Sequence, residues 1–157
     1  MKTILFTMAM LCLCSAQAQA SDAIPLVIKE TTIPLDAQSN RASLAEALGA
    51  IFTVEELAVD IPERLQYGYW PSETGGVATI ALDFDPDGAF LRGILDADCK
   101  EDNPPARELE AWLNANAGPG EAVQDGRVWH FGGFVFELTV IEDAGEDSIY
   151  GIWITKE

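Results

Sequence analysis

The stretch VATIALDFDPDGAFLRGIL, residues 77–95, indicates the class of fold. Residues 77–84 are rich in β-branched and apolar side chains, which favour a strand, and the DPDG sequence at 85–88 is a strong turn signal. Residues 89–95 are apolar again. We therefore predict two antiparallel strands joined by a tight turn.

Upstream, the alternating apolar residues of 64–70 predict another strand of the same meander. Before it, capping boxes at 43–46 and 53–56 predict two helix starts, and Pro62 is expected to end the second helix. Residues 21–41 carry short apolar pieces broken by prolines, which suit an edge strand or an extended arm.

Downstream, Asn103 can cap a third helix, which the Gly-Pro-Gly sequence at 118–120 should end. Three further strands are expected at 127–131, 134–142 and 148–155. This order of elements predicts an α+β fold in which helices cover one face of an antiparallel sheet.

The two halves of this pattern, residues 42–98 and 103–157, are alike: each reads as a helix, a strand, a glycine pair, a long strand, an acidic turn and a last strand. We interpret this as an αβββ tandem duplication; the alternative is chance recurrence of glycine pairs and strand-like sequence. The correspondences are Gly75-Gly76 with Gly132-Gly133, and Gly93 with Gly151.

The first twenty residues have the order of a secretory signal peptide. Lys2 supplies the positive charge, residues 3–14 are almost all apolar, and Ala18-Gln19-Ala20 is an A-x-A cleavage site. The alternatives are a retained N-terminal helix and a lipid anchor at Cys12 or Cys14. We expect cleavage near Ala20 and a periplasmic or secreted protein. The expected organisation is a signal peptide at 1–20, an extended segment at 21–41 and one α+β domain at 42–157.

Removing the signal leaves 8 basic and 26 acidic side chains, a net charge of about −18. Such a surface repels nucleic acid and anionic membranes, and it favours basic proteins and divalent cations as partners. No later segment is long and apolar enough to insert into a membrane. Cys99 is the only cysteine left, so it is either a packed thiol or half of an intermolecular disulfide.

The sequence DFDPDG at 83–88 matches the opening of an EF-hand calcium loop. Asp83, Asp85 and Asp87 could hold calcium weakly, but Ile94 stands where the closing glutamate belongs. The alternative is a hairpin turn with solvated aspartates. The acidic groups at 96–102 and 142–147 are likewise interpreted as solvated loops.

His130 is the only histidine, and no Gly-x-Ser-x-Gly sequence accompanies it. A small hydrolase that uses carboxylates and His130 is therefore an alternative function, as is a calcium-dependent surface module. A structural histidine is the simpler interpretation.

Three aromatic residues, Tyr67, Tyr69 and Trp70, cluster in the first strand of the meander, and such side chains anchor protein interfaces. We expect the tyrosines on the outer face, with packing under the helices as the alternative. Our leading hypothesis is a non-enzymatic exported protein of the inhibitor, immunity or accessory-factor type, which binds a basic protein through these residues. The strand at 134–141 is apolar on both faces, which a homodimer would explain.

Overall fold

The computed structural model describes residues 23–52, 57–71, 76–97, 103–141 and 149–157. Its main element is an eight-stranded antiparallel sheet with the strand order β3-β4-β5-β6-β10-β9-β8-β7. With two helices beside this sheet, the chain is an α+β protein, as the sequence predicts. The strands of the sheet are β3 (Leu57–Ile61), β4 (Arg64–Tyr69), β5 (Ala78–Phe84), β6 (Phe90–Ala97), β7 (Glu121–Val123), β8 (Gly126–Phe131), β9 (Phe134–Ile141) and β10 (Ile149–Lys156).

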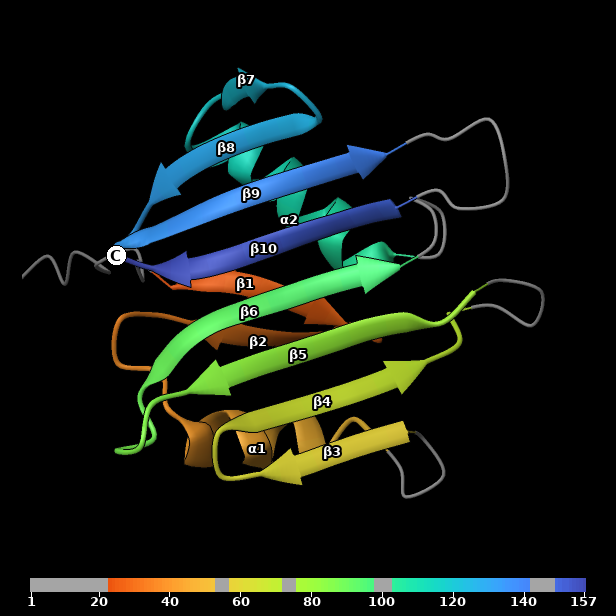
Figure 1. Ribbon diagram of the computed structural model, residues 1–157, viewed down its shortest axis with the longest axis vertical. Helices are drawn as coiled ribbons and strands as arrows, with labels where there is room; N and C mark the ends of the chain where they lie inside the picture. The colour runs from red at the N-terminus through yellow and green to blue at the C-terminus, as the bar shows by residue number, and fades with distance from the viewer. Residues whose placement is uncertain (1–22, 53–56, 72–75, 98–102, 142–148) are drawn as a thin grey trace, which may run out of the picture.

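The remaining elements form a second layer on one face of the sheet (Figure 1). They are the hairpin of β1 (Ile24–Ile28) and β2 (Thr31–Leu35), helix α1 (Arg41–Gly49) and helix α2 (Pro104–Asn116). Every second residue of the long strands points into this layer, as with Ile80, Leu82 and Phe84 on β5. The hydrophobic core therefore lies between the sheet and the second layer.

Asn103 joins the layers. Its side-chain oxygen accepts a hydrogen bond from the backbone N–H of Ala106, which caps α2. Its amide nitrogen donates to the carbonyl oxygens of Leu95 on β6, at 3.2 Å, and Tyr150 on β10, at 2.8 Å. Because Asn103 is almost fully buried, these bonds fix the start of α2 against the two central strands.

The sequence predicts a helix from residue 53 to Pro62, and for the described residues of this segment that prediction is wrong. Leu57–Ile61 is β3, which pairs with β4 along its whole length. Residues 53–56 lie outside the described residues. The apolar residues Leu57, Val59 and Ile61 recur at every second position, which is the period of a strand. Pairing with β4 therefore makes this segment a strand, although the local capping signal favours a helix.

Two other expectations need correction. Residues 24–35 form two strands of a separate hairpin, packed into the core instead of extending as an arm, and Ile24, Ile28 and Leu35 are inaccessible to solvent. The short strand β7 was not expected, so each helix is followed by four strands instead of three.

The glycines Gly93 and Gly151, which the sequence pairs between the two halves, lie on opposite faces of the sheet. Gly93 is opposite Ile154 and faces the core, whereas Gly151 is opposite Asp96 and faces the other side of the sheet. Residues 1–22, which include the expected signal peptide, and Cys99 lie outside the described residues. Among the described helices, none is long and apolar enough to span a membrane.

Candidate protein-binding surface

The tyrosines singled out from the sequence face the core, not the solvent. Tyr69 is buried, and the ring of Tyr67 stacks on Phe52 with centroids 4.6 Å apart. The ammonium group of Lys29 lies 4.7 Å from the centre of the Phe52 ring. Burial raises the pKa of Tyr67, and the negative charge of Asp60 adds to this effect. The expectation that the tyrosines lie on the outer face is therefore wrong.

Trp70, the third residue of that cluster, follows the end of β4 and is 61% exposed. Six other large hydrophobic side chains of the described chain are at least one-third exposed, and all belong to strands of the main sheet. They are Val59, Ile61, Leu91, Val123, Ile141 and Trp153.

The register of the sheet shows where these side chains point. Starting from Trp153, the residues directly opposite in the neighbouring strands are Ile94 on β6 and Glu137 on β9. Continuing outward strand by strand defines a central row that crosses all eight strands on the face opposite the helices. We call that face the open face, because none of the described helices or hairpin strands lies on it (Figure 1). The central row is Val59, Gln66, Ala81, Ile94, Trp153, Glu137, Val128 and Glu121.

The next row toward the β5–β6 turn carries charge. Asp83 on β5 lies between Arg64 on β4 and Arg92 on β6, and its carboxylate accepts hydrogen bonds from both guanidinium groups. The shortest of these, from each Nε atom, are 2.6 Å long. The hydrogen bonds from Arg64 have the largest effect in lowering the pKa of Asp83, and the hydrogen bond from Arg92 lowers it further. Two positive charges around one negative charge leave this arginine row with a local excess of positive charge.

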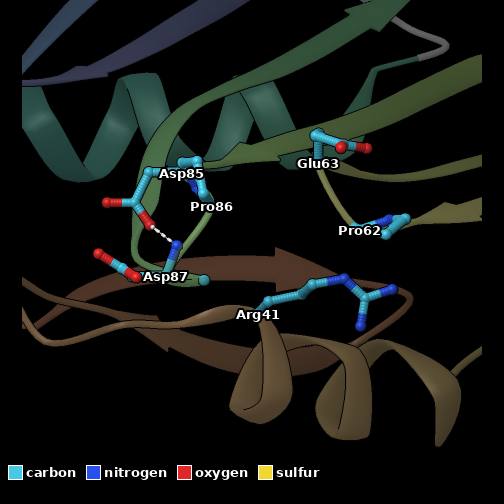
Figure 2. A pocket seen from close by; sticks show the side chains of 7 residues that line it. Arg41, Pro62, Glu63, Asp85, Pro86 and Asp87 are labelled. Carbon is cyan, nitrogen blue, oxygen red and sulfur yellow. Dashed lines mark hydrogen bonds between the residues drawn. The ribbon is translucent and has the colours of Figure 1, made fainter.

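The turn between β5 and β6 does not bring the predicted calcium ligands together. Asp83 is held by the two arginines, while one carboxylate oxygen of Asp85 accepts hydrogen bonds from the backbone N–H groups of Asp87 and Ala89. Figure 2 shows the turn above the start of α1, with the guanidinium of Arg41 directed away from both aspartates toward Pro62. The geometry is that of a capped hairpin turn.

Within the parts of the chain that the structure describes, no three Asp, Glu, His or Cys side chains are arranged to hold a metal ion. The other acidic groups noted in the sequence lie mostly in 98–102 and 142–148, outside the described residues.

His130 lies on the exposed side of β8, opposite Val135, and its Nδ1 atom is 2.8 Å from a carboxylate oxygen of Glu157. It does not line the surface depressions at the β5–β6 turn, beside the arginine row and near Asp125.

Trp153 and Ile94 are the residues that the sequence reasoning missed. The signal was present in β10, where Tyr150, Ile152 and Ile154 alternate as one apolar face and leave Trp153 on the other. Trp153 is 45% exposed there, and an exposed tryptophan is the kind of side chain that protein interfaces use.

Comparisons with protein-family models, with curated proteins and with solved structures found no match. The candidate surface is therefore defined by the geometry of this chain alone.

Proposed function

We propose that this protein is a non-enzymatic exported protein that binds a protein partner through the open face. The observation that carries the proposal is the uncovered central row, in which Trp153 is 45% exposed in the middle of the sheet. Export follows from the signal-peptide pattern of residues 1–20.

The distribution of exposed hydrophobic side chains supports a binding role. Single exposed apolar residues are ordinary, but a collection of them on one face is typical of an interaction surface. Here Val59, Ile61, Trp153 and their neighbours gather on the open face. A flat sheet face of this kind suits a protein partner better than a small molecule, which needs an enclosed pocket.

The overall charge of the chain favours a partner of opposite charge, if that partner is a protein of a different sequence. With a net charge of −17, the chain attracts basic proteins at long range and repels acidic ones. Such a complex should form quickly at low salt and weaken as salt rises.

The test is retention on immobilised protein. Wild type and a Trp153→Asp variant are coupled to resin, and a cell-envelope extract and the purified protein itself are passed over both. We expect proteins retained by wild type to be lost from the variant. Ala111→Asp, which adds the same charge on an exposed position of α2, is the matched control and should behave as wild type. If the three resins retain the same proteins, the open face is not the binding surface.

We also infer a tandem duplication of one helix and four strands. Its support is the strand order, in which β3 to β6 and β7 to β10 run as two meanders from opposite edges to the centre. Because equivalent residues must face the same layer, Leu95 is paired with Ile152 or Ile154, not Gly93 with Gly151. An experimental structure tests this: the two halves should superpose with core residues on core residues, and a fit that exchanges the faces would reject it.

A further inference from the structure

We infer that the partner that covers the open face is a second copy of this chain, so that two sheets pack face to face. The inference rests on the proposed function, because it names the occupant of the same surface. It is drawn from the pattern of charges and apolar side chains on the open face.

The charges near the centre of this face differ between its two halves. The first half carries the arginine row, in which Arg64 and Arg92 outnumber Asp83. In the second half, the central row carries Glu137 and Glu121. Asp96, at the other end of β6, also points to this side, so the complementarity is between the arginine row and the glutamates of the central row, which a two-fold rotation brings together.

The axis that achieves this runs parallel to the strands, midway between β6 and β10. Rotation about it places β6 of one copy over β10 of the other, so Trp153 covers Ile94 of the second copy, and Ile94 covers its Trp153. The most apolar pair of the central row then lies at the centre of the interface, where binding energy is concentrated.

The same rotation places β9 of the second copy over β5. Its Glu137 then lies above Ala81, with Arg64 and Arg92 on the two flanking strands one row away. Arg92 uses only its Nε atom within the described chain, so its two terminal nitrogens remain available to a carboxylate. A two-fold axis perpendicular to the strands is disfavoured, because it would place Glu137 against Glu137.

The dimensions of the face also suit a second copy. Eight strands spaced ~4.8 Å apart and three rows deep give a face of roughly 35 Å by 20 Å. That area is close to the ~800 Å² per partner that a stable interface buries. Two copies would form a sandwich of aligned sheets, a common packing of antiparallel sheets.

A basic partner of another sequence fits this face less well. It would bring positive charge against Arg64 and Arg92, and like charges facing each other across an interface oppose binding. The two occupants also differ in their response to salt. Self-association must overcome repulsion between two chains of −17, so moderate salt should strengthen it, whereas salt should weaken a complex with a basic protein.

The first experiment measures the mass of the purified protein by sedimentation equilibrium, at 20 mM and 150 mM salt. We expect a dimer that is tighter at 150 mM. Trp153→Asp should weaken self-association at least ~30-fold, as expected for a central tryptophan worth 2 kcal/mol or more. Ala111→Asp should leave it unchanged, and circular dichroism checks that both variants fold.

The second experiment exchanges charges between copies. Arg92 and Glu137 are two strands apart in one chain, about 10 Å, so direct pairing requires a second copy. Arg92→Glu alone and Glu137→Arg alone should each weaken the homodimer. Mixing the two variants should restore a heterodimer, because both contacts between positions 92 and 137 then join opposite charges.

The outcomes separate the inference from the proposed function. A wild-type protein that stays monomeric at 200 µM, on the order of the highest concentration such interfaces need, overturns the inference. If that monomer still retains another protein through Trp153, the proposed function stands. A dimer that persists unchanged in Trp153→Asp places the interface elsewhere and overturns the inference as well.

Discussion

Arg64 and Asp83 lie directly opposite each other on β4 and β5, and they are joined by two hydrogen bonds of 2.6 and 3.0 Å. Arg92 donates a third to the same carboxylate. The network therefore links the three neighbouring strands β4, β5 and β6. Its carboxylate is mostly buried, whereas its two arginines are partly exposed to solvent.

We predict that this network makes the fold sensitive to acid. The pKa of Asp83 is lowered in the folded state, so the unfolded chain binds its proton first as the pH falls. The stabilisation is present above the unfolded pKa and is lost as the pH falls through the folded pKa. Asp83→Asn should cost about 1 kcal/mol at pH 7, after allowing for solvent screening. Urea unfolding measures this, and the difference from wild type should shrink toward pH 2; a constant difference would contradict the prediction.

A second prediction concerns the β1–β2 turn. Lys29 and Glu30 have φ values of +47° and +67°, a left-handed conformation that suits asparagine and glycine. Glu30→Gly should stabilise the protein by roughly 0.5–1 kcal/mol, since relief of strain exceeds the added chain entropy.

Lys29→Gly is the informative comparison for that turn. It relieves the same kind of strain but removes the ammonium group from the rings of Phe52 and Tyr69. The lost interaction is worth about 0.5–1 kcal/mol, so this variant should gain less than Glu30→Gly, or nothing. Thermal unfolding of both variants measures the difference, and an equal gain would show that the ammonium group of Lys29 contributes nothing to stability through these rings.

The third prediction tests Asn103. Asn103→Ala should cost about 2–3 kcal/mol, because it removes the cap of α2 and leaves two buried carbonyl oxygens without their donor. Asn103→Asp retains the cap acceptor but faces the carbonyl oxygens with a carboxylate.

The pKa of such a buried aspartate should be raised, so its protonated form is the better fit. The stability of Asn103→Asp relative to wild type should therefore be greatest below the unfolded pKa and decline as the pH rises through the folded pKa. Chemical unfolding between pH 4 and pH 8 provides the measurement. A cost independent of pH would indicate that the side chain turns to solvent.

The fourth prediction compares two glycines. A Cβ atom on Gly126 would collide with the carbonyl oxygen of Leu138, within the β8–β9 pair. Gly126→Ala should therefore cost at least about 3 kcal/mol, because backbone and not a side chain must move. Gly49, at the end of α1, has open space around it, and Gly49→Ala should stabilise the protein by about 0.5 kcal/mol. Calorimetry of the pair measures both, and similar midpoints would reject the collision.

The sequence predicts the central hairpin and most strands of this fold because their signals are local. The DPDG turn at 85–88 and the alternation in 64–70 depend only on neighbouring residues, and both are confirmed. The segment 57–61 was misjudged because a capping box is also local, whereas the pairing with β4 that makes it a strand is not.

The candidate surface was harder to predict because alternation shows that two faces differ, not which one is covered. Tyr67 and Tyr69 do share a face, as expected, but α1 and the β1–β2 hairpin cover that face. For this hairpin the sequence predicts only an edge strand or an extended arm, so it offers too few elements to decide which side of the sheet is covered. Trp153 becomes a candidate binding residue only when the strand order is known, because that order places β10 in the middle of the sheet.

The place of β10 in the sheet also bears on how the protein folds. Strand β10 follows the other described strands along the chain, yet it fills the gap between β6 and β9. Until it arrives, both of those strands have a bare edge, and bare edges recruit other chains. A chain in which β10 has not yet paired is therefore the species at greatest risk of aggregation, and it is the one that a folding chaperone would protect.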